Sequence, residues 1–450
     1  MHCCRRQCLR YRYIQAADSL VITMRRIIIQ DSGHIHPFNE PARDLRVHNV
    51  PLWLWQRDVL GPNFSEEREF ASLIEAQSHD GDIKAATLVH KDNIFFNKTL
   101  VEEFVDRAIS GKKAVQIAFH NRDPAIVEHV LPLTKNFKRS NQLLLGDLWY
   151  FPDGIANTSD VEPLIIDTES REVGYYHVPP YMATVSGDLV YQLPRKSFVS
   201  IESWVHLFVV DILFGVFAQG KDMEDKADSD WRYRLKILFH ALLEQKRVID
   251  SSEIVSIGKN VIIDPSAVIH GPTKIGDNVT IGPGTVVDNC IIGNNVNISQ
   301  GCHLMLSVVS DGCFLPFRAA LFMTTLMENT MVAQNSCLQL CVVGRDTFIG
   351  AGTTFTDFKI LPGTIFAAAD RQERAATNLL VLGGCVGHHC RLSSGLVIYP
   401  ARTIESDVVI LAEAHGQYVT DDVTYEDSNH HALILDYPYP RQYPRMEMPS

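Results

Sequence analysis

The C-terminal half of the chain repeats an aliphatic side chain at every sixth residue. Four residues after each of these positions comes a second small or apolar side chain. The leading residues of the first run are Ile257, Ile263, Ile269, Ile275, Ile281 and Val287. After a slip of one position near Cys290, the pattern continues through Val309, Leu315, Leu321, Met327 and Ala333, then Val343, Ile349 and Phe355, and finally Val386, Leu392, Ile398, Ile404 and Ile410.

A period of six predicts a β-helix. Three short strands make one triangular coil, and each coil stacks its aliphatic side chains on those of the next, because a single hexad cannot bury its own face. Ordinary hairpins alternate with a period of two and do not sustain this spacing. We therefore predict a left-handed parallel β-helix of hexapeptide repeats over residues 254–412, with Gly258, Gly276 and Gly282 at tight corners that need unusual backbone dihedrals.

Two C-terminal segments depart from the repeat. Residues 357–380 contain Pro362-Gly363 and a charged run, and they predict a loop leaving one corner of the coil. Such a loop either carries binding function or is a plain insertion, which costs little free energy. Residues 413–450 end in a proline-rich stretch that cannot continue a helix or a central strand, so we expect a tail or strap.

Residues 24–250 show another pattern, in which apolar strands alternate with amphipathic helices. The expected elements are a strand at Ile27–Ile29, a helix at Leu100–Ile109, a strand at Ala114–Phe119, a strand at Leu143–Leu145 that ends in Gly146-Asp147, and helices at 198–218 and 230–246. The acidic run Lys221–Asp225 is expected to be a solvated loop between the last two helices. This alternation predicts an α/β domain with a parallel sheet covered on both faces.

Composition narrows the class of protein. The chain has 450 residues, 46% of them hydrophobic, which is enough for two or more domains, and its formal charge of -12 argues against binding nucleic acid. The most apolar stretch, Val205–Ala218, is interrupted by His206 and Asp211, so we expect no membrane span.

Seven of ten cysteines fall in the repeats, which favours reduced, packed thiols in a cytoplasmic protein. Residues 1–23, an Arg-rich leader, are expected to be disordered or upstream of the true start.

A sheet domain followed by a hexapeptide β-helix resembles the bifunctional sugar-nucleotide enzymes of the N-acetylglucosamine-1-phosphate uridylyltransferase and acetyltransferase type. Asn49-Val50-Pro51-Leu52 is similar to the Gly-Lys-Pro-Leu segment of that family, and Pro41–Arg46 resembles the Arg-Pro…Leu-Arg segment of a divergent branch. Gly146-Asp147 falls where the family keeps a Gly-Asp whose carboxylate holds magnesium. The resemblance thus implies a nucleotidyltransferase-like, Rossmann-like domain with Asp147 as the ligand of Mg²⁺.

The chain departs from this family at the phosphate loop. In place of Gly-x-Gly-Thr-Arg it has Gln30–His34, with Gly33 as its one glycine, and Val50 replaces a lysine. With fewer backbone amides available, a phosphate would be held by the Gly33 loop together with Arg43 and Arg46. In isolation, Asp147 is equally well explained as a residue that caps the turn after a strand.

The repeats contain one motif of acyltransferases. Val386-Gly387-His388-His389-Cys390 is similar to a Val/Ile-x-His-Asp-Cys segment in which the histidine is the general base. The resemblance implies that His388 would deprotonate an acceptor that attacks the thioester of acetyl-CoA or another acyl-CoA. His389 stands where the family often has an aspartate.

Two hypotheses follow from these motifs. The first is a sugar-nucleotide-pathway transferase that binds a sugar phosphate or nucleotide sugar, with nucleotidyl transfer, acyl transfer or both. The second is a non-catalytic structural or regulatory protein that retains both folds. The missing phosphate loop favours this second hypothesis. Because β-helices of this type pack along flat faces, a homotrimer is expected in either case.

Overall fold

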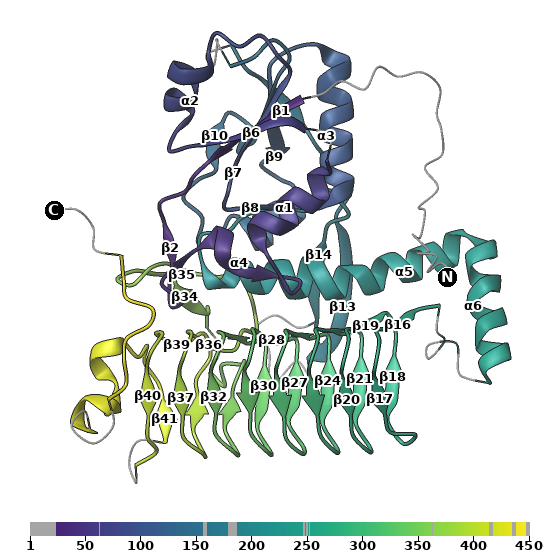
Figure 1. Cartoon of the computed structure of the whole chain (residues 1–450), viewed down its shortest axis with the longest axis vertical. Helices are drawn as coiled ribbons and strands as arrows, with labels where there is room; N and C mark the ends of the chain where they lie inside the picture. The colour runs from purple at the N-terminus through teal and green to yellow at the C-terminus, as the bar shows by residue number, and fades with distance from the viewer. Residues whose placement is uncertain are drawn as a thin grey trace, which may run out of the picture.

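The structure is a computed structural model, and it describes residues 24–62, 64–155, 160–178, 187–245, 248, 251, 253–361, 363–413, 417–433 and 438–446. The expectation for the leader at 1–23 lies outside these residues. An α/β domain lies on one side of a long triangular prism; the helix α5 runs along the prism toward its N-terminal end, and α6 turns across the direction of the prism beyond that end (Figure 1).

The prism consists of three eight-stranded parallel sheets, which confirms the β-helix prediction. The first sheet, which faces the α/β domain, contains β16 (Val255–Ile257), β19 (Thr273–Ile275), β22 (Ile291–Ile292), β25 (Val308–Val309), β28 (Thr325–Leu326), β31 (Val342–Val343), β36 (Cys385–Val386) and β39 (Thr403–Ile404). The second contains β17 (Ile262–Ile263), β20 (Thr280–Ile281), β23 (Asn297–Ile298), β26 (Phe314–Leu315), β29 (Met331–Val332), β32 (Phe348–Ile349), β37 (Arg391–Leu392) and β40 (Val409–Ile410). The third contains β18 (Val268–His270), β21 (Val286–Asp288), β24 (His303–Met305), β27 (Ala320–Phe322), β30 (Cys337–Gln339), β33 (Thr354–Phe355), β38 (Val397–Ile398) and β41 (Tyr418–Val419).

The coils differ in length, and this changes which residues point inward. Ile257 pairs with Ile275 and Ile275 with Ile292, so an 18-residue coil is followed by a 17-residue coil. Each shorter coil moves the hexad phase by one position. Leu326 and Val332 are therefore the residues packed in the prism core. The prediction that Met327 and Ala333 continue the inward columns was wrong for this reason.

The corners of the prism are made by residues in the left-handed backbone region. One corner column contains Asn260, Asn278, Asn295, Gly312, Asn329, Asp346, His389 and Asp407, all with φ between 52° and 73°. Asparagine, aspartate and glycine adopt this conformation most readily. Gly258, Gly276 and Gly282 do not have a positive φ, so that part of the prediction was wrong. They are small because the next coil is close: a Cβ on Gly258 would lie 2.4 Å from the Gly276 carbonyl oxygen.

The α/β domain is built on one mixed sheet. Its order is β12 (Glu162–Ile165), β9 (Val115–His120), β11 (Leu143–Phe151), β7 (Thr87–Lys91), β1 (Met24–Ile29) and β6 (Phe64–Phe70), with β10 (Lys138–Ser140) beside β11. β1 is parallel to β6 and β7, whereas β11 is antiparallel to both of its long neighbours. The expected parallel sheet is therefore interrupted at its centre. Smaller pairs are β2 (His34–Ile35) with β3 (Glu40–Pro41), β4 (Arg46–Val47) with β5 (Val50–Pro51), β8 (Ile94–Phe96) with β15 (Phe198–Ser200), and β13 (Arg171–Val178) with β14 (Gly187–Leu193).

Helices cover the sheet and lead into the prism. They are α1 (Leu52–Leu60), α2 (Leu73–Asp80), α3 (Lys98–Gly111), α4 (Trp204–Phe208), the π-helix η3 (Val209–Phe217), α5 (Ala218–Ser229) and α6 (Trp231–Glu244). Short turns are η1 (Ala42–Asp44), η2 (Ile126–Val130), η5 (Tyr425–Asp427) and η6 (Asn429–Leu433). Lys221–Asp225 lies within α5, so the prediction of a loop there was wrong. The helix continues from η3 and ends at Ser229, and the side chain of the next residue, Asp230, caps α6.

The two domains share one hydrophobic core. Trp204 and Phe208 pack in the same cluster as Val308 and Val342, the outward side chains of the first prism sheet. The segment 357–380, which was expected to be a loop, contains the hairpin β34 (Phe366–Ala368) and β35 (Arg374–Ala376). Its side chains Ile365, Ala367 and Leu379 pack in the same core. The insertion therefore packs against the α/β domain.

One helical run among the described residues, Trp204–Ser229, is long and apolar enough to span a membrane. Its most apolar window is 78% buried inside the protein. A buried core helix has the same composition, so this run is weak evidence for a membrane segment.

Candidate functional sites

The first candidate site lies at the carboxyl edge of β1 and β7. Asp31 follows β1, and Lys91 is the last residue of β7. The Lys91 Nζ lies 2.9 Å from the Asp147 Oδ2. Burial raises the pKa of Asp31; the Lys91 ammonium lowers it, and the carboxylates of Glu202 and Asp147 add smaller upward effects. In open α/β sheets, ligands bind outside the carboxyl ends of the parallel strands. Asp31, Lys91 and Asp147 are therefore placed where a ligand is expected.

Asp147 does not end its strand. β11 continues to Phe151, and its pairing with β9 is irregular between Leu145 and Trp149, which is the stretch that contains Asp147. The prediction of a strand that ends in Gly-Asp was wrong, and so was the strand-end alternative for Asp147. A bulge inside a strand turns a side chain toward a position that regular pleating would not allow.

The three residues expected to hold phosphate are not brought together. Gly33 is exposed, and its N–H donates to Asp31 Oδ2 over 3.2 Å. Arg43 is at the same edge, where its guanidinium donates to Glu69 and contacts Asp92. Arg46 instead contacts Glu328 of the prism. Both arginines are thus paired with carboxylates of the chain itself.

Carboxylates make this edge strongly acidic. Asp92 accepts a hydrogen bond from the Asp31 N–H at 2.8 Å, and burial raises the pKa of Asp92 to about 6. No cluster of three or more metal-binding side chains occurs among the described residues. Magnesium, however, is commonly held by one or two carboxylates together with substrate phosphates. Asp31 and Asp147 would supply these carboxylates, and a Mg²⁺–phosphate group would relieve the repulsion between them.

The second candidate site surrounds His388, which is fully buried where the prism meets both the α/β domain and the C-terminal tail. Its Nδ1 accepts a hydrogen bond from the Arg345 N–H at 2.9 Å, and its Nε2 lies 3.4 Å from Glu40 Oε2. Phe38 and Tyr443 contact the ring, with centroid distances of 4.9 and 4.7 Å.

This environment leaves His388 poorly suited to act as a base. Burial lowers its pKa, so the ring is neutral at neutral pH. Because Nδ1 accepts from Arg345, the proton of the neutral ring is on Nε2 and faces Glu40. The ring-nitrogen lone pair of the neutral His388, on Nδ1, is therefore already used by the Arg345 N–H.

His389 has the geometry that was expected of His388. Its Nδ1 lies 2.8 Å from the Oδ1 of the fully buried Asp407, so Nδ1–H donates to the carboxylate, and the Nε2 lone pair accepts from the Gln442 side-chain amide at 3.3 Å, a contact with the tail that an acceptor would have to replace. A carboxylate that fixes the tautomer in this way is typical of a histidine base. Sequence reasoning missed this pair, although a signal existed: the two residues are 18 positions apart, which is the length of one coil.

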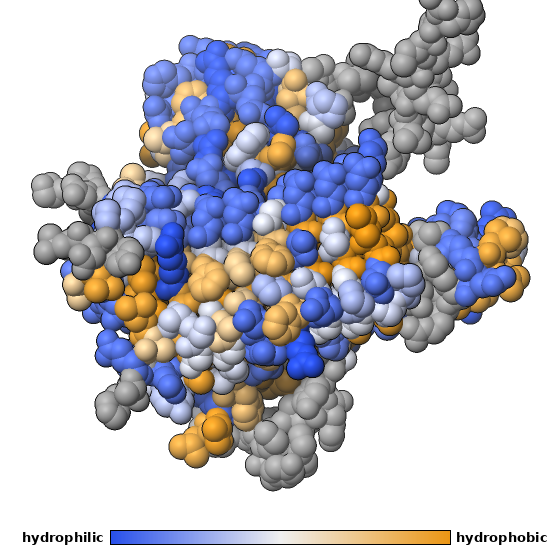
Figure 2. All heavy atoms as spheres, turned by 60° about the horizontal axis from the view of Figure 1, so that its bottom comes forward, coloured by the Kyte–Doolittle hydropathy of each residue, from blue (hydrophilic) through white to orange (hydrophobic). Residues whose placement is uncertain are grey.

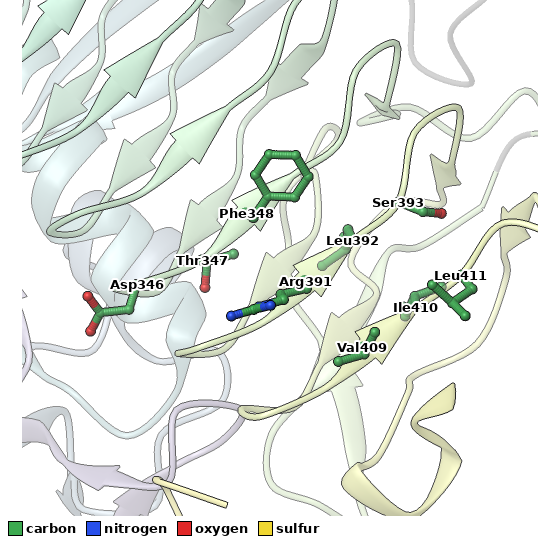
Figure 3. A pocket seen from close by; sticks show the side chains of 9 residues that line it. All are labelled: Asp346, Thr347, Phe348, Arg391, Leu392, Ser393, Val409, Ile410 and Leu411. Atoms are coloured by element: carbon green, nitrogen blue, oxygen red, sulfur yellow. The ribbon is translucent and has the colours of Figure 1, made fainter. Parts of the chain in front are cut away.

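A groove opens beside this pair on the second prism sheet. It has a volume of about 560 Å³ and is lined by Asp346, Thr347, Phe348, Arg391, Leu392, Ser393, Val409, Ile410 and Leu411. The Arg391 side chain extends toward Asp346 and Thr347 (Figure 3). Its guanidinium also lies 5.2 Å from the ring of Tyr439, which stacks on His389 with centroids 4.5 Å apart. The groove therefore combines an apolar wall with a cation close to His389.

The C-terminal tail is bound tightly over both histidines. Asp407 Oδ2 accepts hydrogen bonds from the N–H groups of Gln442 and Tyr443, at 2.9 and 2.7 Å. Arg445 pairs with the buried Glu405 and with Glu426. The strap expected from the proline-rich sequence thus closes the last coils of the prism.

The structure joins a prism of hexapeptide repeats to an α/β sheet domain. Residues 254–289 match the family described as bacterial transferase hexapeptide (six repeats). The chain is similar to proteins named bifunctional protein GlmU. It is 25% identical to that of Acaryochloris marina over 209 residues, which are 43% of this chain and 44% of the relative.

Two further proteins named GlmU are similar to this chain at about the same identity. The GlmU protein of Synechococcus elongatus is 27% identical over 167 residues, 33% of this chain and 37% of that protein, and the one of Thermotoga petrophila is 27% identical over 176 residues, 38% and 37% of the two chains. The chain matches less than half the length of each of these relatives. The comparisons confirm the resemblance at the level of a divergent relative.

Proposed function

We propose that this protein is a transferase of the sugar-nucleotide pathway, whose α/β domain binds a sugar phosphate or nucleotide sugar at the edge formed by Asp31, Lys91 and Asp147. The observation that carries this proposal is the 2.9 Å pair of Lys91 and Asp147 at the carboxyl edge of the sheet. Lys91 would bind a phosphate oxygen, while Asp31 and Asp147 would hold Mg²⁺. The metal neutralises phosphate charge during nucleotidyl transfer.

The acidic edge makes ligand binding depend on the metal. Without Mg²⁺, Glu69, Asp92 and Asp147 repel a polyphosphate, and Arg43 is already paired. If Asp147 held Mg²⁺ together with Asp31, the Lys91 ammonium that now pairs with Asp147 would be available to bind phosphate. Binding of a sugar nucleotide is therefore expected only in the presence of the divalent metal.

Calorimetric titration with UTP or dTTP tests this site. Wild type is expected to bind the Mg²⁺–nucleotide, and Asp147→Asn is expected to weaken binding by about 10–100-fold, because one metal ligand loses its charge. Asp58→Asn, at an exposed carboxylate on α1, is the matched control and leaves binding unchanged. If wild type at tens of micromolar shows no heat with either nucleotide, the protein is instead the inactive structural or regulatory relative.

Acyl transfer is a second function, supported by the His389–Asp407 pair beside the groove. An acceptor hydroxyl or amine would lose its proton to His389 Nε2 as it attacks the thioester carbonyl of acetyl-CoA or another acyl-CoA, while Asp407 stabilises the charged ring. The C–S bond then breaks, and the CoA thiolate leaves as the thiol with the proton from His389. His388, the residue expected from the motif, then serves to hold the prism, Glu40 and Tyr443 together. Tyr439 and Gln442 must move from His389 before an acceptor can reach it.

Release of thiol from acetyl-CoA with candidate amino sugars distinguishes the two histidines. His389→Asn is expected to lower turnover at least about 100-fold. Asparagine suits this position because it fills the same corner column at four other coils. His388→Asn keeps an acceptor for the Arg345 N–H and is expected to retain most of the turnover. A larger loss of turnover in His388→Asn than in His389→Asn would show that His388 is the base.

The homotrimer remains a prediction, as does the cytoplasmic location. The first prism sheet is covered by the α/β domain of its own chain. Partner subunits therefore have the second and third sheets available.

A further inference from the structure

The helix α6 carries a large apolar surface on its outer side. Its side chains Trp231, Leu235, Leu238, Phe239, Leu242 and Leu243 are between 43% and 77% exposed. Four of them, at 231, 235, 238 and 242, follow the spacing of one helix face. The opposite side is packed, because Ile237 lies in one cluster with Ile254 and Val255 at the first coil of the prism, and Ala241 is buried as well.

This surface is at the end of the molecule. α6 projects beyond β16 to β18 in Figure 1, and Figure 2 shows apolar atoms at the outer edge of the same projection. Ile257 and Ile262 of the first coil, which has no coil before it, are 49% and 67% exposed. The apolar character therefore extends from α6 onto the open end of the prism.

We propose that α6 is a self-association surface, on which the same helix of a second copy of this chain packs. The six side chains expose roughly 700 Å² of apolar area, given that aromatic residues alone bury about 150–250 Å² each. The largest apolar patch on a typical monomer is about 300–600 Å². Two copies would bury roughly 1,400 Å², which lies within the range of about 1,200–2,000 Å² of stable protein interfaces.

Charge favours a second copy over a lipid surface. A membrane-bound amphipathic helix uses its basic side chains to contact anionic headgroups. On α6, Arg234 is paired with Asp228 at 3.0 Å and Lys236 with Glu253 at 2.7 Å, while the Arg232 guanidinium lies 5.7 Å from the ring of Trp231. The formal charge of the whole chain is -12. An apolar face with two of its three flanking cations paired, on an acidic protein, suits an identical face, which meets it about a two-fold axis.

Light scattering coupled to size exclusion tests the proposal on the full chain. Leu238→Glu and Leu238→Lys are each expected to weaken self-association at least about 100-fold, because each buries a charge in the contact. An equal mixture of the two variants is expected to recover the wild-type mass, since Glu and Lys then face each other. Ile360→Glu, at an exposed apolar residue of the insertion, is the matched control.

Three results would overturn the proposal. One is a monomeric wild type at tens of micromolar. Another is a Leu238→Glu variant with the same mass as wild type, which would place self-association elsewhere. The third is wild-type sedimentation with vesicles of anionic phospholipid that Leu238→Glu abolishes without any change in mass, since α6 would then bind lipid. Unchanged circular dichroism of the variants shows that α6 still folds.

Discussion

Replacing Phe355 by alanine is expected to lower the free energy of unfolding by about 3–5 kcal/mol, the usual cost of removing a buried aromatic ring. Phe355 is fully buried in the prism and lies in one column between Leu338 and Ile398. The chain leaves the prism after this residue and returns at Gly384, where an added Cβ would lie 3.1 Å from the Phe355 ring. Neighbours held this tightly cannot collapse into the cavity.

Denaturant unfolding measures this effect as a shift of the midpoint at constant slope. Phe355→Leu fills most of the same space and is expected to recover more than half of the loss. Phe366→Ala is the matched control, because that ring is 46% exposed on β34 and its removal should change stability by about 0.5 kcal/mol or less. Equal losses for Phe355→Ala and Phe366→Ala would show that the column does not carry the stability of the prism.

The prism was predictable because its geometry requires one inward side chain in every hexad. The exact phase was not, since Leu326 and Met327 are both apolar and only the coil length decides between them. β11 escaped prediction for a related reason. It forms an antiparallel hairpin with β10 through a short turn at Asn141. An apolar run, however, does not indicate whether a strand is parallel or antiparallel to its neighbours.

The candidate sites were predictable only in part. Asp147 was proposed from the resemblance and stays a prediction, while its partner Lys91 was missed because it belongs to a different strand and has no motif of its own. The contact of Arg46 with Glu328 joins residues 282 positions apart and follows no period, so sequence reasoning assigned Arg46 to phosphate. The pairing of His389 with Asp407 could have been predicted from the sequence, because the two residues are one coil apart.

The joint between the domains contains a buried acid with a strongly shifted pKa. Asp211 of η3 is fully buried; its Oδ1 accepts from the His48 N–H at 2.7 Å and its Oδ2 accepts from the Thr325 hydroxyl at 3.0 Å. It thereby connects the helix, the segment before α1 and the first prism sheet. Burial raises its pKa to about 7, well above that of an aspartate in an unfolded chain.

This shift makes stability fall as the pH rises. Between about pH 4 and pH 7 the folded protein keeps a proton on Asp211 that the unfolded chain releases. The contribution of Asp211 is therefore complete below the unfolded pKa and is lost as the pH rises through the folded pKa. A shift of about three units corresponds to about 4 kcal/mol.

Asp211→Asn is expected to remove this pH dependence. The amide oxygen still accepts from the His48 N–H, and the amide nitrogen donates to the Thr325 hydroxyl oxygen, so packing is kept while no charge develops. Between about pH 5 and pH 8, denaturant unfolding should find that wild type loses about 2.5 kcal/mol relative to the variant. Glu102→Gln, an exposed carboxylate on α3, controls for general charge effects and should run parallel to wild type. Parallel curves for Asp211→Asn and wild type would mean that Asp211 is ionised in the folded protein throughout this range, and that the joint between the domains tolerates a buried charge.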